Sequence, residues 1–381
     1  MTHRARIAFL AGICGLPVVA EDLHLPQFHG FATEGFTYSN DNNYLGVNTS
    51  SGSFDWTEAA LNANEQLNDN FRIGAQVHLT KLGEFGRWGP TFDWALIDYQ
   101  IKPWAGLRAG KVKIRWGLYN DTQDADPGYL WSLLPEPMYA ADWRATDLSQ
   151  YGGELYGRFH LPGRTGELGY SAYYGYFYYA SNDGNMEGFR ELGYYFSKIP
   201  GGITPGFDLR WKTPLKGLTL GGSLMLYNAH GSLIDNGTFR QPLTFWPAYY
   251  GQYEFGKFFA SAQYMKLVQY TDVSLHGAAP VSSLTDNRAW FAMAGYHVTN
   301  QLQLGVYWAR NIIASAPHPS EPGNYFRDWV VSGRYDFNSF LYAKVEGHFI
   351  DGAGLGFYGF DNPNGLKPQT ILAVVKLGFC F

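Results

Sequence analysis

The chain has 381 residues and a formal net charge of −5, and it combines 18% aromatic residues and 46 glycines with only 16% charged residues. Ordinary soluble domains carry about 25% charged residues, and the Ala- and Leu-rich stretches of a soluble helical core are nearly absent. The mean hydropathy is −0.23, and no internal run reaches the ~18 apolar residues that a membrane-spanning helix needs. An aromatic-rich, polar, all-β chain remains, which is the composition expected of an outer-membrane β-barrel.

Residues 1–20 have the pattern of a secretory signal peptide. Arg4 and Arg6 form a positive start, 7–16 is apolar but too short to span a bilayer, and Val18-Val19-Ala20 is a small-residue cleavage site. We therefore expect a single mature barrel domain at 21–381.

Cleavage of this segment would leave Cys380 as the only cysteine. Neither an intrachain disulfide nor a cysteine-based metal site is then expected. Removal of Arg4 and Arg6 also makes the net charge more negative, which argues against nucleic acid as a partner.

The mature sequence repeats segments of about ten residues in which apolar and polar side chains alternate. Because strand side chains point to opposite faces in turn, each segment has one face suited to lipid and one suited to water. Short and long connectors between the segments also alternate, as they do between the two rims of a transmembrane barrel. The short connectors lie near 65–71, 102–106, 162–166, 213–217, 254–257, 299–301 and 337–339, and the long ones at 39–53, 82–91, 117–150, 178–203, 229–246, 269–286, 313–326 and 352–369.

These connectors predict an antiparallel β-barrel of about 16 strands, with short periplasmic turns and long extracellular loops. Twelve or eighteen strands result if the weak segments at 54–64, 92–101 and 287–298 are merged differently. The early segments carry small residues on their apolar face, including Ala59, Ala63 and Ala75. Small residues suit contact with another barrel better than contact with acyl chains, so we expect a homo-oligomer.

The longest connector, 117–150, follows the fifth predicted strand and is strongly acidic. Its only base is Arg144, and its six acids are Asp121, Asp124, Asp126, Glu136, Asp142 and Asp147. Asp126 followed by Pro127 is a candidate N-cap for a short helical turn through Leu134.

The strand before this connector alternates Lys111, Lys113 and Arg115 with Val112, Ile114 and Trp116. If the apolar face meets lipid, the three cations line the bore beside the acidic connector, and Arg158 adds a fourth. Opposed rows of charge across a water-filled gap create a transverse field. The connector is then an inward constriction loop. Alternatively, it is an extracellular loop whose acids bind divalent cations or lipopolysaccharide, or are simply solvated.

Further charged residues fall on the predicted inner faces of the other strands. A solvated wall without selectivity is an equally good interpretation for most of them. They are Arg72, Arg210, Lys212, Arg334 and Lys344, together with Glu58, Asp98, Glu154, Asp208, Glu254, Asp328, Asp336 and Glu346.

The last segment carries an apolar face that ends on a terminal aromatic residue. The residues of this face are Ile371, Ala373, Val375, Leu377, Phe379 and Phe381. A terminal aromatic on an alternating strand resembles the signal read by the bacterial barrel-assembly machinery, which we expect as a partner together with outer-membrane lipid and lipopolysaccharide.

Residues 109–121 (Ala-Gly-Lys-Val-Lys-Ile-Arg-Trp-Gly-Leu-Tyr-Asn-Asp) resemble the segment before the inward loop of Gram-negative porins. The resemblance is greatest to the phosphate-selective porin O/P-like group, in which an Asp-rich loop and a strand opening like Tyr151-Gly152-Gly153 follow. It covers about 105–160 and implies a trimeric passive channel in the outer membrane. Trp116 replaces a common proline, and no lysine-rich cluster demands phosphate.

Signals of catalysis are weak. The ten histidines are scattered without metal-binding spacing, and neither a Gly-x-Ser-x-Gly elbow nor a glycine-rich phosphate loop occurs. We therefore expect no catalytic residue, cofactor or metal. The alternatives to a porin are a barrel that acts as an adhesin or receptor through its loops and, with less support, a barrel hydrolase.

Overall fold

The computed structural model describes residues 26–381, and the predicted signal peptide lies outside these residues. Neither helix in this range is long and apolar enough to span a bilayer. The helices are α1 (Arg144–Asp147) and α2 (Gly184–Glu191), and the strands are β1 (Gln27–Ser39), β2 (Ser53–Asn68), β3 (Phe71–Leu82), β4 (Thr91–Lys102), β5 (Ala105–Lys113), β6 (Ser149–His160), β7 (Glu167–Tyr178), β8 (Phe196–Ile203), β9 (Gly206–Lys212), β10 (Leu218–Leu233), β11 (Thr238–Phe255), β12 (Phe258–Ser274), β13 (Val281–His297), β14 (Leu302–Ile313), β15 (Tyr325–Asp336), β16 (Leu341–Asp351) and β17 (Gln369–Cys380).

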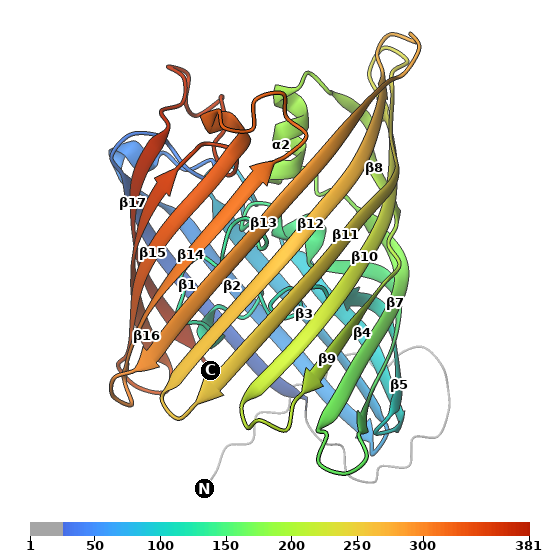
Figure 1. Cartoon of the computed structure of the whole chain (residues 1–381), viewed down its shortest axis with the longest axis vertical. Helices are drawn as coiled ribbons and strands as arrows, with labels where there is room; N and C mark the ends of the chain where they lie inside the picture. Colours follow the sequence, from blue (N-terminus) through green and yellow to red (C-terminus); the bar gives the residue numbers. More distant parts are fainter. Residues whose placement is uncertain (1–25) are drawn as a thin grey trace, which may run out of the picture.

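All strands pair antiparallel with their neighbours, and β1 closes the sheet on β17 (Figure 1). Strands β8 and β9 both pair with β7 and β10, so they are two halves of one wall strand interrupted at 204–205. The wall therefore has sixteen strands, which confirms the predicted number and fold class.

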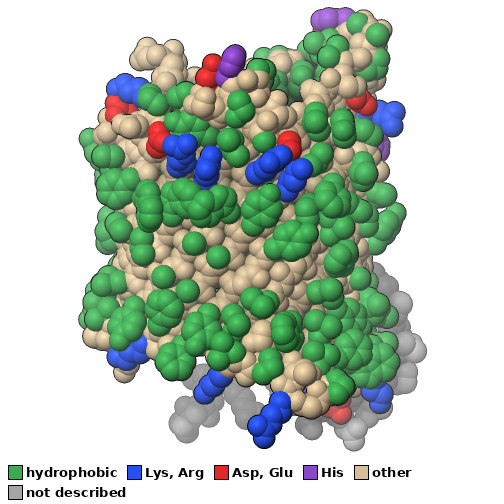
Figure 2. All heavy atoms as spheres, in the orientation of Figure 1, with side chains coloured by type: hydrophobic (Ala, Val, Ile, Leu, Met, Phe, Trp, Pro, Cys, Tyr) green, Lys and Arg blue, Asp and Glu red, His purple; other side chains and the backbone are tan. Residues whose placement is uncertain are grey.

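The alternation of side chains places one face of each strand inside the barrel. In β16, Lys344, Glu346 and His348 are at most 2% exposed, whereas Val345 and Phe349 are more than half exposed. The predicted outer face of β17 is likewise exposed from Ile371 to Phe379. Apolar side chains cover much of the outer surface in bands above and below its middle (Figure 2), as a barrel that spans a membrane requires.

Three predicted long connectors are shorter than expected. Strands β10 and β11 continue to a loop at 234–237, and β12 and β13 continue to a loop at 275–280, because alternation and pairing persist above the rim as tall hairpins. In the third, predicted as 178–203, residues 196–203 form β8. Pro200, Gly201 and Gly202 interrupt the alternation there and hide the strand at the sequence level.

Candidate pore constriction

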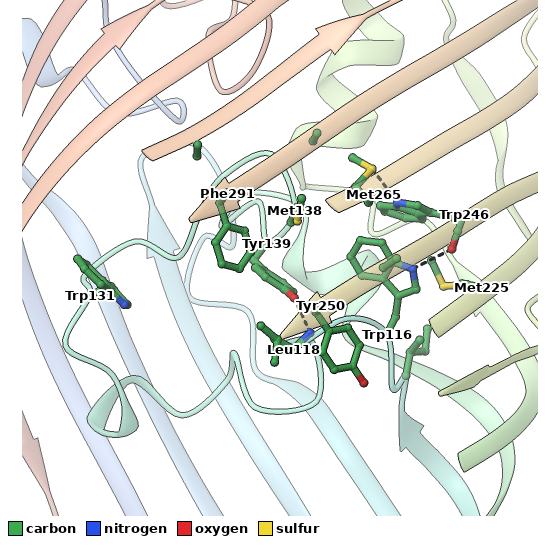
Figure 3. Packing of buried hydrophobic residues seen from close by; sticks show 14 of the residues in the cluster. Trp116, Leu118, Trp131, Met138, Tyr139, Met225, Trp246, Tyr250, Met265 and Phe291 are labelled. Carbon is green, nitrogen blue, oxygen red and sulfur yellow. Dashed lines mark hydrogen bonds between the residues drawn. The ribbon is translucent and has the colours of Figure 1, made fainter. Parts of the chain in front are cut away.

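The β5–β6 loop (114–148) lies inside the barrel and contacts buried side chains of the opposite wall (Figure 3). The Trp116 indole N–H donates to the Trp246 carbonyl at 2.9 Å, and the two rings lie 4.5 Å apart. Gly117 has φ +66°, and a Cβ there would come 2.6 Å from Gln263 and Tyr139. A glycine is therefore required where the chain crosses from one wall to the other.

Residues 112–116 do not keep the two faces of a strand, so the predicted lipid-facing row is wrong. Val112, Ile114 and Trp116 are 1–2% exposed inside the barrel. Val112 is still in β5, on the inner face that it shares with Arg108. Ile114 and Trp116 follow the end of β5 at Lys113, where the chain turns inward and both faces lie in the interior.

Lys111 also differs from the prediction, which placed it in the bore with Lys113 and Arg115. Its cross-strand partner is Tyr151, which is 54% exposed on the outer face, and its ammonium lies 5.4 Å from the Tyr151 ring centre. The ammonium donates to the Phe92 carbonyl at 2.5 Å. Lys111 therefore lies on the outer wall and not in the bore.

Lys113 and Arg115 do meet acids of the loop. The Lys113 ammonium lies 2.7 Å from Asp124, and the Arg115 guanidinium lies 3.6 Å from Asp121 and 3.2 Å from Glu154 of β6. These contacts form where the loop leaves the wall, so one short stretch of chain supplies both signs of charge.

Strand β5 and its neighbours β3, β4 and β6 extend this network of ion pairs. Arg108 bridges Asp98 and Glu154 at 3.1 and 3.0 Å, and Arg72 lies 2.9 Å from Asp98. On the other side, Arg210 of β9 reaches Asp121 at 3.2 Å. A cavity of about 380 Å³ lies among these residues, lined by Arg72, Arg108, Lys113, Arg115, Asp124 and Glu154.

A second cavity, of about 670 Å³, lies across the loop toward the turns of β11–β14. Tyr119 and Tyr129 of the loop line it, with ring centres 5.7 Å apart, together with Arg210 and Glu254 of the wall. Space within the barrel on both sides of the loop is therefore lined by charged and aromatic side chains.

Asp126 anchors the middle of the loop and does not cap a helix. Its carboxylate lies 3.0 Å from Lys344 and 2.8 Å from Lys376, and it accepts a hydrogen bond from the Tyr342 hydroxyl at 2.6 Å. Because these groups occupy the carboxylate, residues 126–128 form one 3-10 turn, and the predicted helical turn through Leu134 does not form. Burial opposes ionisation, but the two ammonium groups hold the pKa of Asp126 below its usual value.

Glu346 and Arg334 hold the same part of the loop through its backbone. Glu346 accepts hydrogen bonds from the backbone N–H groups of Ser132 and Leu133, both at 3.0 Å. Arg334 donates to the carbonyls of Pro127 and Tyr129 at 2.6 and 2.7 Å. Lys376 was the anchor missed at the sequence level, although the alternation of the last strand already placed it on the inner face.

The remaining acids of the loop face away from the basic wall. Glu136 and Asp142 are each 4% exposed, and Asp142 accepts a hydrogen bond from the Tyr358 hydroxyl. Burial raises the pKa of Glu136, that of Asp142 to about 6 and that of Asp147 to about 7. These three carboxyls therefore belong to the packing between loops.

Arg158 is also outside the ion-pair network. It lies on the inner face of β6, four residues beyond Glu154 toward the turn, and is exposed. Among the ion pairs of residues 26–381 it has no partner.

No protein-family model matches the chain, and no curated protein matches its sequence. Several solved structures share its fold at low sequence identity. OmpT, an outer membrane protein of Vibrio cholerae, aligns over 96% of this chain and 100% of its own, with a TM-score of 0.55 and 11% identity. An anion-selective porin from Comamonas acidovorans aligns over 94% and 99%, with a TM-score of 0.58 and 11% identity.

The outer membrane channel DcaP of Acinetobacter baumannii aligns over 93% of this chain and 97% of its own, with a TM-score of 0.56 and 10% identity. At these identities the likeness concerns the fold. The chain has the architecture of Gram-negative outer-membrane barrels, among them porins, which agrees with the predicted outer-membrane location. The finer resemblance to the phosphate-selective group is carried only by residues 105–160.

Proposed function

We propose that the protein is a passive outer-membrane channel, a porin, for small hydrophilic solutes or ions. The observation that carries this proposal is the charged cavity where Lys113, Arg115 and the acids of the β5–β6 loop meet inside a sixteen-stranded barrel. Side chains of the wall do not fill a barrel of this strand number. The β5–β6 loop is then the element that narrows the bore.

The pairing of charges affects which solutes and ions the proposed channel would favour. Arg72, Arg108, Lys113, Arg115 and Arg210 each lie within 4 Å of a carboxylate. A nearly balanced field of this kind orients dipolar solutes and disfavours apolar ones, without strongly excluding either sign of ion. We therefore propose weak ion selectivity and not obligate phosphate transport, although the resemblance over 105–160 is greatest to the phosphate-selective group.

Single-channel recording in planar bilayers tests the channel. Discrete steps of steady conductance from the refolded protein support a porin. Silence from a folded, inserted sample would instead favour the receptor or hydrolase alternative, in which the interior remains closed by its loops.

The proposed oligomer is a homotrimer assembled through the early strands. Small side chains lie in register on their outer face, with Ala32 opposite Ala59, Ala63 opposite Ala75, and Ala75 opposite Ala95. Cross-linking at native expression levels tests this proposal, since trapping of monomers alone would contradict it.

A further inference from the structure

Four neighbouring strands each carry a cationic residue next to an aromatic residue, at one height on the outer wall. Strands β13, β14 and β15 each place an arginine two residues from a tryptophan, and β12 places a lysine two residues from a tyrosine. We call these cations the basic row, which consists of Lys266, Arg288, Arg310 and Arg327, and the aromatic residues beside them are Tyr264, Trp290, Trp308 and Trp329.

The strand register puts the basic row on the outer face. Arg310 is the cross-strand partner of both Trp290 and Arg327, and Lys266 is the partner of Arg288. Trp290 is 38% exposed and Trp329 57%, whereas the intervening inward residues are almost completely buried. Figure 2 shows basic side chains in a row above the upper apolar band of this wall.

The height of the row matches the outer edge of a membrane. Each of its four residues lies eight or nine positions from the turn end of its strand. At ~3.4 Å per residue and a tilt of ~40°, that distance corresponds to about 22 Å along the barrel axis. The apolar band of such barrels is about 25 Å tall, so the row lies where lipid headgroups of the outer leaflet begin.

The acids nearby neutralise only part of this charge. Asp286 lies 2.9 Å from Arg288 and 3.5 Å from Lys266, and Asp351 lies 3.0 Å from Arg327. Arg310 has no ion pair among residues 26–381, and its Nε is buried without a hydrogen-bond partner. Four cations against two acids leave a net positive surface with one guanidinium free to bind an anion.

The aromatic side chains below the row complete an amphipathic surface. The ring centres of Trp290 and Trp308 are 4.0 Å apart, and those of Trp308 and Trp329 are 6.0 Å apart. Indole rings at this depth contact acyl chains, while guanidinium groups above them match the geometry of phosphate oxygens. The row does not extend to the next strand, where β16 places Asp351 beyond the outward Phe349.

We propose that the outer wall of β12–β15 is a binding site for the phosphorylated glycolipid of the outer leaflet, lipid A. The basic row would bind its phosphates, and the aromatic residues would contact its acyl chains. Arg310, the member without an acid partner, is the central contact.

Thermal unfolding of the detergent-solubilised protein, titrated with diphosphoryl lipid A, tests the site. Binding to the folded state raises the unfolding temperature with lipid concentration. We expect a rise with diphosphoryl lipid A that is much smaller with fully dephosphorylated lipid A and with phosphatidylglycerol. This experiment needs only the unmodified protein. Equal rises of the unfolding temperature with all three lipids, or no rise, would overturn the proposal.

A pair of matched variants locates the site on the wall. One variant changes the basic row to glutamine (Lys266→Gln, Arg288→Gln, Arg310→Gln and Arg327→Gln), and the control makes four equivalent changes near the turns (Lys102→Gln, Arg164→Gln, Lys216→Gln and Lys257→Gln). The first should weaken the apparent affinity for diphosphoryl lipid A at least about tenfold, and the control should not. Equal weakening in both variants, or in neither, would mean that the basic row is not the site.

Discussion

The first end and the middle of the β5–β6 loop use charge in different environments. At its start, Asp121 and its partner Arg115 have side chains that are 15% and 27% exposed. Ten residues on from Trp116, around Asp126, the partner side chains Lys344 and Lys376 are at most 1% exposed. Water screens partly exposed pairs and reduces their contribution to stability, whereas a buried charge that loses its partner is strongly unfavourable. The first end can therefore tune the field of the bore, while the middle fixes the position of the loop.

Replacement of Asp126 should have the largest effect. Asp126→Ala leaves the buried ammonium of Lys344 without a counter-charge and leaves that of Lys376 with Glu58 alone, which should lower the free energy of unfolding by about 3–5 kcal/mol. We also expect the loop to leave its position, which should increase and destabilise the single-channel current. Denaturant titration and bilayer recording measure the two effects.

Asp121→Ala is the matched control, since it removes one acid of the same loop from partners that are 27% and 29% exposed. It should cost no more than about 1 kcal/mol. Equal losses for the two variants would mean that burial does not distinguish the first end of the loop from its middle. The combined change Asp126→Leu and Lys344→Met should recover much of the stability, because Lys376 keeps Glu58 as its partner and no unpaired charge remains.

The contact between loops should weaken as the pH rises. Burial raises the pKa of Asp183, the N-cap of α2, to about 8, and that of Asp147 in α1 to about 7. A carboxyl whose pKa is raised by folding stabilises the folded state fully at a pH below its unfolded value of about 4. That stability is lost as the pH rises through the folded value.

We expect hydrogen exchange of the α2 backbone amides, corrected for intrinsic rates, to increase at least about tenfold between pH 5 and pH 8. Asp183→Asn keeps an N-cap acceptor but cannot ionise, so it should reduce this pH dependence. An equal dependence in the variant would assign the change to other groups. Exchange near Asp126 should not increase over this range, because its pKa is lowered and not raised.

Replacement of the cations at the first end should change selectivity by a smaller free energy. Lys113→Gln with Arg115→Gln leaves Asp121 and Asp124 without these partners, so the ion preference should move toward cations. A unit charge at ~4–8 Å contributes on the order of 1 kcal/mol at an intermediate dielectric, enough for a several-fold change in permeability ratio. Reversal potentials across a KCl gradient measure it, and salt should reduce it because the Debye length is only about 3 Å at 1 M.

Lys111→Gln is the control for this pair, because it removes the same charge from the outer wall two residues away. It should leave reversal potentials unchanged. A shift of equal size from Lys111→Gln, or none from the double variant in a folded channel, would show that the first end does not set the field.

The sequence predicted the alternation of the strands, and it missed which face of β5 turns outward and which distant residues meet when the barrel closes. Alternation was sufficient for the sixteen-stranded wall, and it placed Lys344 and Glu346 inside. It failed at Lys111 and Val112, which lie within β5 and do alternate, because the apolar residues at 112, 114 and 116 led to the wrong choice of outer face. The role of Asp126 was not predictable from its neighbours, since its partners Lys344 and Lys376 lie more than 200 positions away and meet it only when the barrel closes.

Replacement of Arg158 should have the smallest effect on ion selectivity, because this residue does not contact the β5–β6 loop. It lies on the inner face of β6 like Glu154, but it is exposed, near the turn, and outside the network of the loop. A fixed charge in open solvent is screened within about 8 Å at physiological ionic strength. Arg158→Gln should therefore leave the KCl reversal potential nearly unchanged at that salt concentration. At 10 mM, where the screening length is about 30 Å, it should shift the reversal potential slightly. A shift as large as that of the Lys113 and Arg115 pair would mean that the selective field lies at the periplasmic mouth, and that inner-face position alone, without contact to the loop, is enough to set it.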